Sequence, residues 1–217
     1  MNVLSDQSSY HRISASADDV ISSTLLGVCA SLKPADGQNA RSAVRGLLAH
    51  GLDVIAKVYP RVCLLDLRDH PLPLFDGRRP ETLNDPAVAL ILSCVSKSGA
   101  LLLAVPAYWS GVSGVFKNFV DLLCGPAYDL DAGARTVFAS KAVGLLIVGA
   151  DETSALLGAT QAVQIMTSTG SRVVGKPVVV GDPRSHISET ATARISAELI
   201  ALTAELARHS AVAGASR

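Results

Sequence analysis

A short polar loop after an apolar run carries the side chains best suited to bind an anion. The run at 24–30 leads into a loop that contains the Ser31 hydroxyl, the Lys33 ammonium and the Asn39 amide. Apolar residues then recur at helical spacing, so the loop ends at a helix N-terminus. The free N–H groups and the dipole of such a terminus favour a phosphate. The loop is therefore either a phosphate-binding site or an ordinary polar connector.

Other nucleotide, metal and nucleophile motifs are missing from the sequence. No G-x-G-x-x-G follows the first apolar run, which excludes the common dinucleotide fingerprint. Residues 170–176 spell G-x-x-x-x-G-K, but Pro177 replaces the magnesium-binding Ser or Thr, and the segment leads into a predicted strand. The 5 histidines show no metal-ligand spacing, and the 4 cysteines form no C-x-x-C. We expect no metal, no catalytic acid–base pair, and buried reduced thiols.

Composition narrows the class of protein further. The chain has 217 residues, 49% of them hydrophobic but only 4% aromatic, so it has enough aliphatic residues for a real core. The 19 basic and 19 acidic residues balance, which argues against nucleic-acid binding and against an acidic electron carrier. No apolar stretch reaches membrane-spanning length, and the N-terminus lacks a secretory signal. We expect a cytoplasmic protein with no membrane or nucleic-acid partner.

Apolar runs of strand length alternate with segments of helical periodicity five times. The strand-like runs are apolar throughout, so both faces of each strand are predicted to be covered. This pattern is typical of an α/β three-layer sandwich with a parallel sheet. Predicted strands lie at 24–30, 62–66, 100–105, 142–148 and 173–180; predicted helices lie at 40–51, 86–97, 115–123 and 155–167, with a closing helix from 188.

The domain organisation follows from the same pattern. Residues 1–20 are polar and aperiodic and are predicted to be a flexible leader, and residues 21–210 a single domain. Parallel α/β sheets bind ligands beyond the carboxyl ends of their strands. The loops expected to form the site are therefore 31–39, 106–113 and 149–154.

The segment 106–121 carries the most specific motif. It reads Pro-Ala-Tyr-Trp-Ser-Gly-Val-Ser-Gly-Val-Phe-Lys-Asn-Phe-Val-Asp. This resembles the P-x-Y-x(5)-G-x-x-K-x-x-x-D stretch of the NAD(P)H-dependent FMN reductase family. The resemblance extends over about 24–182 and is strongest at 101–123. It implies a flavodoxin-like fold with a five-stranded parallel sheet in the order 2-1-3-4-5.

The resemblance also implies which residues hold FMN. The first loop would hold the phosphate, the second would line the flavin, and 149–154 would close its other side. Lys117 and Asp121 would be structural. The implied cofactor-binding residues are Ser31, Lys33, Gln38, Asn39, Pro106, Ala107, Tyr108, Trp109, Gly149, Ala150, Asp151, Glu152 and Thr153.

The implied reaction is hydride transfer from NADPH or NADH to FMN, with no catalytic residue from the protein. Two departures from the family pattern concern the cofactor phosphate. Lys33 stands where the family usually has an arginine and lacks its bidentate fork, and Asp151 and Glu152 add negative charge to the third loop.

Several functions remain open at this point. The protein either releases reduced FMN to a flavin-dependent monooxygenase or keeps its flavin and reduces a small-molecule acceptor such as a quinone or azo compound. A non-catalytic electron carrier and a scaffold that has lost flavin are alternatives. The resemblance further implies a homodimer or homotetramer.

Overall fold

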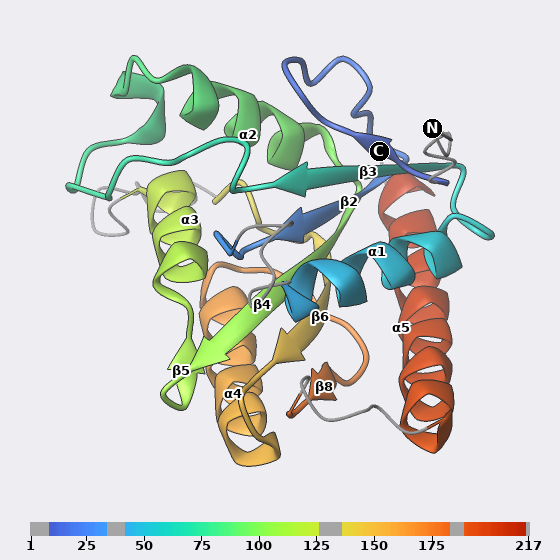
Figure 1. Cartoon of the computed structure of the whole chain (residues 1–217). Helices are drawn as coiled ribbons and strands as arrows, with labels where there is room; N and C mark the ends of the chain where they lie inside the picture. Colours follow the sequence, from blue (N-terminus) through green and yellow to red (C-terminus); the bar gives the residue numbers. More distant parts are fainter. Residues whose placement is uncertain (1–8, 34–41, 126–135, 183–188, 216–217) are drawn as a thin grey trace, which may run out of the picture.

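The strands of this chain form one sheet whose carboxyl edge carries the loops of interest (Figure 1). The computed structural model describes residues 9–33, 42–125, 136–182 and 189–215. Within them the sheet has the order β1-β3-β2-β4-β6-β7, with β5 paired to β4 and β8 paired to β6. The strands are β1 (His11–Arg12), β2 (Thr24–Cys29), β3 (Arg61–Asp66), β4 (Ala100–Tyr108), β5 (Gly111–Val112), β6 (Ala142–Val148), β7 (Arg172–Val173) and β8 (Val178–Val180).

The expected flavodoxin-like order is confirmed, but the described sheet has 8 strands and not five, because β1 adds an edge, β5 pairs with β4, and the last predicted strand is divided into β7 and β8. Strands β3, β2, β4 and β6 lie side by side, followed by β7 and β8, and all of these pairings are parallel. Every residue of β2 and β6 is buried, as continuous apolar runs require when both faces of a sheet are covered. The order reverses between β2 and β4, where a ligand crevice forms in such folds.

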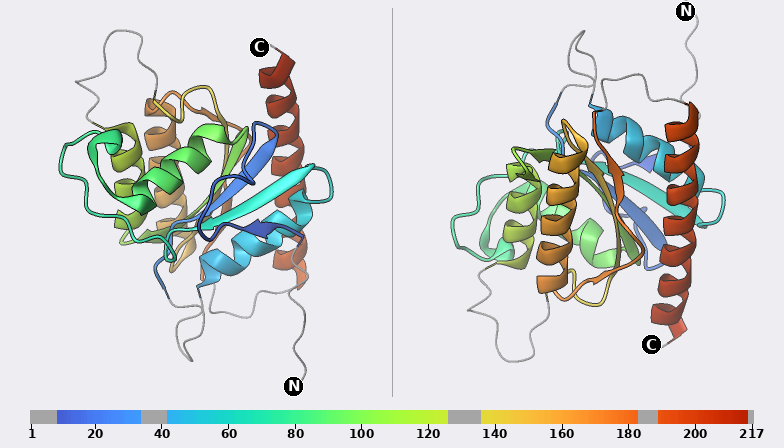
Figure 2. Two further views of the ribbon diagram at one scale, coloured as in Figure 1. Left: turned by 90° about the horizontal axis from the view of Figure 1, so that it is seen from above. Right: turned by 90° about the horizontal axis from the view of Figure 1, so that it is seen from below.

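Helices cover both faces and give three layers, which the views from above and below show clearly (Figure 2). Helices α1 and α5 pack on one face, and α2, α3 and α4 pack on the other. The helices are α1 (Ala43–Ile55), α2 (Pro86–Lys97), α3 (Gly114–Cys124), α4 (Glu152–Ser168) and α5 (Glu189–Ala215), with a short 3-10 helix, η1 (Pro80–Thr82).

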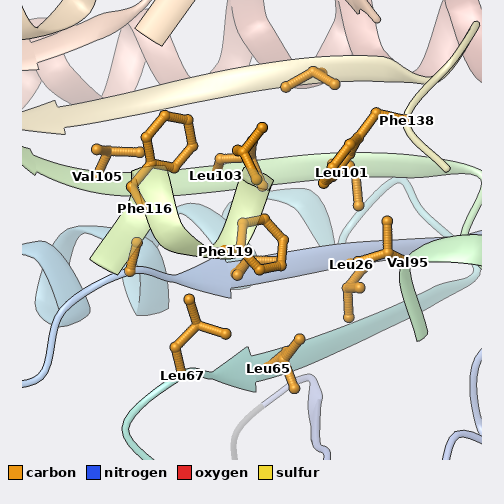
Figure 3. Close-up of a cluster of buried hydrophobic side chains, with 14 of the residues drawn as sticks. Leu26, Leu65, Leu67, Val95, Leu101, Leu103, Val105, Phe116, Phe119 and Phe138 are labelled. Atoms are coloured by element: carbon orange, nitrogen blue, oxygen red, sulfur yellow. The ribbon is translucent and has the colours of Figure 1, made fainter. Parts of the chain in front are cut away.

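The larger of the two cores lies under α3 (Figure 3). Phe116 and Phe119 extend from α3 toward the side chains of β4 and β2. The ring of Phe119 meets Phe138 edge to face, with centroids 5.7 Å apart and planes at 70°. Such aromatic pairs contribute about 0.5–1.5 kcal/mol beyond the area they bury. This contact fixes α3, and with it the loop that precedes it, on the sheet.

Two predicted strand boundaries are wrong, and proline explains both. The predicted strand 100–105 continues to Tyr108. Pro106 does not end it, because the N–H that proline lacks would point toward β2, and β2 pairs with β4 only as far as Ala104. The predicted strand 173–180 is interrupted. Gly175 turns the chain at φ +65° and Pro177 offers no N–H, so β7 and β8 are separate.

Helix α1 also differs from its predicted span of 40–51. It begins after Ser42, whose side chain accepts from the N–H of Arg45, and it continues past Gly51 to Ile55. Gly51 is not a stop signal here. A Cβ at this position would lie 3.3 Å from Leu199, so glycine lets α1 approach α5 closely.

The described part of the predicted leader, residues 9–20, is packed against the sheet. Strand β1 pairs in parallel with β3, and Ile13, Ala17 and Val20 are buried in the core under α2. A flexible leader does not describe these residues, because their three apolar side chains, spaced i, i+4 and i+7, are buried against the sheet. Residues 1–8 lie outside the described part of the chain.

Two further expectations concern the described residues only. All four cysteines are free, and Cys29, Cys63 and Cys94 are buried, as predicted. Within the described ranges no cluster of His, Cys, Asp and Glu is arranged to hold a metal ion, and none of the helices has the length and apolarity to span a bilayer.

We expect replacement by alanine to have opposite effects on the free energy of unfolding at two glycines inside helices. Gly158 of α4 lies against β4, where a Cβ would come within 2.6 Å of the Ala107 Cβ, whereas a Cβ on Gly46 of α1 would meet nothing within 4 Å. We expect Gly158→Ala to lower the free energy of unfolding by about 1–3 kcal/mol through overpacking. The matched change Gly46→Ala should raise it by about 0.5–1 kcal/mol. Urea unfolding followed by circular dichroism measures both, and equal effects would contradict the close approach of α4.

Candidate functional site

The carboxyl edge of the sheet brings the first two predicted loops together. Ser113, which caps α3 by accepting from the N–H of Phe116, also donates its hydroxyl to the carbonyl of Ala30 at 3.2 Å. The ammonium of Lys33 lies 5.6 Å from the ring centroid of Tyr108. Cation–π contacts at exposed sites contribute about 0.5–1 kcal/mol. Residues distant in the sequence therefore form one surface.

The first loop is anchored to the start of α1 by two hydroxyl groups. Ser42 donates to the buried Ser31 Oγ at 3.1 Å, and Ser31 Oγ accepts from the N–H of Lys33 at 3.4 Å. The predicted proximity of the loop and a helix N-terminus is confirmed at this contact. Two further predicted phosphate residues, Gln38 and Asn39, lie outside the described residues.

A buried ion pair supports this loop, and sequence reasoning missed it. Arg45 Nε donates to Asp66 Oδ2 at 2.6 Å and Arg45 Nη2 to Asp66 Oδ1 at 3.2 Å. The side chain of Asp66 is 0% exposed and that of Arg45 14%. Hydrogen bonding to Asp66 raises the pKa of the Arg45 guanidinium. Removing one partner of such a buried pair costs about 3–5 kcal/mol.

The same guanidinium binds the backbone of the first loop. Arg45 Nη1 donates to the carbonyl of Lys33 at 3.0 Å and Nη2 to that of Ser31 at 3.2 Å. The sequence offers one signal for this role, an arginine in the first turn of the helix that follows the loop. The second member of the pair is Asp66 at the end of β3, but only the strand order shows that Asp66 and Arg45 meet.

The second predicted loop is a tight hairpin. Strands β4 and β5 pair antiparallel, which leaves only Trp109 and Ser110 in the turn. Both have positive φ, 52° and 61°, as a type I′ turn requires. This conformation favours Asn and Gly, so a Trp-Ser turn is strained. The hairpin is braced by α4, because Gln161 Oε1 accepts from the N–H of Val112 at 3.1 Å.

Of the four residues of this hairpin that were predicted to bind FMN, two are buried and two are exposed. Pro106 and Ala107 are buried in the sheet, so only their backbone groups are available to a ligand. Tyr108 is 44% exposed and Trp109 fully exposed. Partial burial raises the pKa of the Tyr108 hydroxyl, which therefore stays protonated at neutral pH.

The third loop is shorter than predicted because α4 begins at Glu152. Asp151 caps this helix. Its carboxylate accepts from the N–H of Ser154 at 2.7 Å and from its hydroxyl at 3.0 Å. These bonds lower the pKa of Asp151. The Asp151 carboxylate, which would repel a phosphate if it faced the site, is thus turned onto its own helix, while Glu152 and Thr153 are exposed.

Glycines let the third loop approach the helix closely. A Cβ on Gly149 would lie 2.6 Å from the N atom of Ala155, and one on Gly181 would overlap the backbone of Glu152. The N–H of Gly149 donates to the carbonyl of Val180 at 3.0 Å. The ends of β6 and β8 therefore pack directly beneath the N-terminus of α4, and Ala150 lies exposed between Gly149 and the cap.

The second half of the 106–121 motif makes contacts within the protein. Lys117 donates to both carboxylate oxygens of Asp121 at 2.7 Å along α3. Asn118 between them holds the segment before η1, accepting from the N–H of Phe75 and donating to the carbonyl of Pro73, each at 2.8 Å. Lys117 and Asp121 thus pair with each other along α3, and Asn118 joins α3 to the segment 73–75.

Comparisons with known proteins agree with this geometry. The sequence pattern of the family described as NADPH-dependent FMN reductase matches residues 24–184. Comparison with curated protein sequences gives no significant match.

Solved structures resemble this chain in fold at low sequence identity. The apo form of an NADH:FMN oxidoreductase, EmoB, has a TM-score of 0.64 at 15% identity, covering 83% of this chain and 88% of its own. RosB with bound 8-demethyl-8-formylriboflavin-5′-phosphate has a TM-score of 0.66 at 15% identity, covering 87% and 79%. FerB of Paracoccus denitrificans, an NAD(P)H:acceptor oxidoreductase, has a TM-score of 0.64 at 15% identity, and the match covers 86% of this chain and 98% of FerB.

The strained turn makes a prediction about stability. Replacing Ser110, at φ 61°, by glycine removes the cost of a positive φ. We expect Ser110→Gly to raise the free energy of unfolding by about 0.5–1 kcal/mol. Ser96→Gly, inside helix α2, should instead lower it by about 0.5 kcal/mol. Urea unfolding of both variants checks this, and a destabilised Ser110→Gly would show that the serine side chain supports the turn.

Proposed function

Because this chain belongs to the NADPH-dependent FMN reductase family, it is an NAD(P)H:FMN oxidoreductase with FMN as cofactor, and we propose that the carboxyl edge described above is its flavin site. The phosphate would lie at the first loop, and the ring system at the β4–β5 hairpin. The third loop, 149–153, would border the opposite side of the ring. The contact of the Lys33 ammonium with the Tyr108 ring carries this proposal, since it joins the first two parts of the site.

The described residues fit the phosphate end of FMN. Lys33 supplies a positive charge on an exposed side chain, and Ser31 a hydroxyl beside it. Helix α1 begins directly behind the loop, and its dipole favours an anion. Gln38 and Asn39 belong to the same proposed site by sequence position.

The described residues also fit a flat aromatic ring with one open side. The buried Pro106 and Ala107 would offer backbone groups, while the exposed Tyr108 and Trp109 would flank the ring. On the far side, Gly149 and Ala150 lack bulky side chains, so the third loop would leave room for the ring that it borders. A nicotinamide would reach the flavin from the exposed side of the hairpin.

The chain's own part in the reaction is to bind and orient. When bound, FMN supplies the chemistry of accepting a hydride from NAD(P)H and passing electrons to an acceptor. No residue is assigned as a proton donor or nucleophile. Burial raises the pKa of the Cys29 thiol near the site to about 12, so this group stays protonated and inert.

We propose that the flavin is exchangeable and that reduced FMN is delivered to a flavin-dependent monooxygenase. The support is the phosphate loop, where a single lysine replaces the bidentate fork of an arginine, while Arg45 is taken up by Asp66. A resident flavin that reduces a quinone or azo compound is the second candidate. The exposed hairpin beside the ring, open to a small acceptor, favours it.

The proposal includes a homodimer or homotetramer in the cytoplasm. Exposed apolar side chains gather near the hairpin: Tyr108, Trp109, Leu156 and Leu157. Leu157 lies one helical turn before Gln161, which holds the hairpin, so both helix and hairpin contribute to this surface. Apolar surface of this kind is typical of contacts between subunits. Four free cysteines agree with a reducing compartment.

A titration tests the proposed function. The protein has one tryptophan, Trp109, on the hairpin, so we expect added FMN to quench its emission saturably. NADPH and then NADH, added under air, should be oxidised in the presence of FMN. A micromolar dissociation constant supports exchangeable flavin, and a nanomolar constant resident flavin. Binding without oxidation would support an electron carrier, and absence of binding would contradict the site.

Lys33 makes a separate prediction about ligand selectivity. The Lys33→Gln variant should bind FMN about 3- to 10-fold more weakly, because one exposed charge contact with the phosphate is lost, and should bind riboflavin unchanged. Lys57→Gln, at the opposite end of α1, is the matched control and should leave both affinities unchanged. Flavin fluorescence quenching gives the dissociation constants. Equal weakening of FMN and riboflavin binding would contradict a place for Lys33 in the phosphate site.

A further inference from the structure

The carboxylate of Asp66 is fully buried at the carboxyl end of β3, beside Cys29 at the end of β2. A buried charge must be paired and hydrogen-bonded to be tolerated. Asp66 meets this requirement with Arg45, with the N–H of Arg68 at 3.1 Å, and with Arg12 Nη2 at 3.6 Å. Stability alone does not explain this arrangement, because apolar residues in place of a buried ion pair are often equally or more stabilising.

Four of the five N–H donors of Arg45 are bonded to protein groups. Its guanidinium binds both oxygens of Asp66 and the carbonyl oxygens of Ser31 and Lys33, and its charge is neutralised by Asp66. It is therefore poorly placed to act as a direct ligand of a cofactor phosphate. Its bonds run instead to the backbone of the loop proposed to hold that phosphate.

Carbonyl orientation decides whether a loop attracts or repels an anion. A phosphate is bound by N–H groups and repelled by carbonyl oxygens, since their partial charges have opposite sign. The carbonyl oxygens of Ser31 and Lys33 accept hydrogen bonds from Arg45, so they point toward its positive charge. The loop then presents the Lys33 side chain and the Ser31 hydroxyl without competing oxygens from these two peptide groups.

We propose that Arg45, fixed by Asp66, is a positioning residue that shapes the 31–33 loop into a phosphate receptor and so selects FMN over riboflavin. This inference rests on the proposed flavin site. The planar fork of arginine is essential to it, because one side chain must reach two carboxylate oxygens and two carbonyls at once.

The N-terminal segment contributes to the same cluster. Arg12 on β1 lies near Asp66 and binds Asp69 through Nε at 3.0 Å and Nη2 at 2.6 Å. This strand lies outside the part of the chain that matches the family, 24–184. This edge strand therefore adds a second guanidinium near the same Asp66 oxygen that Arg45 binds.

The affinity ratio between FMN and riboflavin tests the role of Arg45. The two ligands differ only in the phosphate, so a merely structural residue would change both affinities alike. We expect Arg45→Met to weaken FMN binding about tenfold or more and riboflavin binding less than about twofold. Arg208→Met, which breaks the exposed ion pair with Glu205 on α5, is the matched control and should change neither. Quenching of flavin fluorescence gives the constants, and thermal unfolding reports the fold.

A second variant, Arg45→Lys, keeps the test decisive if Arg45→Met fails to fold. The Arg45→Lys variant retains a positive charge opposite Asp66 but lacks the planar fork. Its melting temperature should therefore stay near that of the wild type while its preference for FMN falls. Arg12→Gln should lower the preference less, because Arg12 touches no loop carbonyl in the described structure.

Three outcomes would overturn the inference. Equal weakening of FMN and riboflavin in folded Arg45→Lys would show a structural role only. An unchanged FMN preference in the same variant would show that the loop needs no such support. Absence of FMN binding by the wild type would overturn the proposed flavin site and this inference with it, whereas wild-type binding with either of the first two results would leave the flavin site standing.

Discussion

Burial of the parallel sheet on both faces is the constraint on which this structure depends. Strands such as β2 and β6 have no exposed residue, so their sequences are apolar from end to end. Polar chemistry is consequently confined to the edge where the strands end. Ser31, Tyr108 and Gly149 each follow or close one of three neighbouring strands, and this shared position, rather than proximity in the sequence, makes them a candidate site.

Electrostatics at that edge are arranged by bonds within the protein. The chain is neutral overall, so a phosphate must be attracted by local geometry and not by net charge. Two acidic groups near the edge have defined partners: Asp151 binds the N-terminus of α4, and Asp66 binds Arg45. Lys33 is left with only an aromatic ring as its neighbour among the described side-chain interactions, and its charge remains available.

Strain and close approach occur where the ring of the cofactor is proposed to lie. The Trp-Ser turn adopts a conformation better suited to Asn and Gly. Gly149 and Gly181 lie against backbone atoms, and Gly158 lies against the Ala107 Cβ, at distances that a side chain would prevent. The hairpin is held in this conformation by Gln161 and by the Ser113 cap. Rigid elements thus present a fully exposed tryptophan at a fixed position, which an unsupported loop would not do.

The sequence by itself determined the fold class, the strand order through the family resemblance, and the three loops of the candidate site, because apolar periodicity and the 106–121 motif are local signals. Tertiary structure alone decided the rest. The packing of residues 9–20, the continuation of β4 through Pro106 and the capping role of Asp151 depend on neighbours distant in the chain. The pairing of Arg45 with Asp66 depends on the adjacency of β2 and β3, since a guanidinium on one element and a carboxylate on another carry no mutual signal until the sheet brings them together.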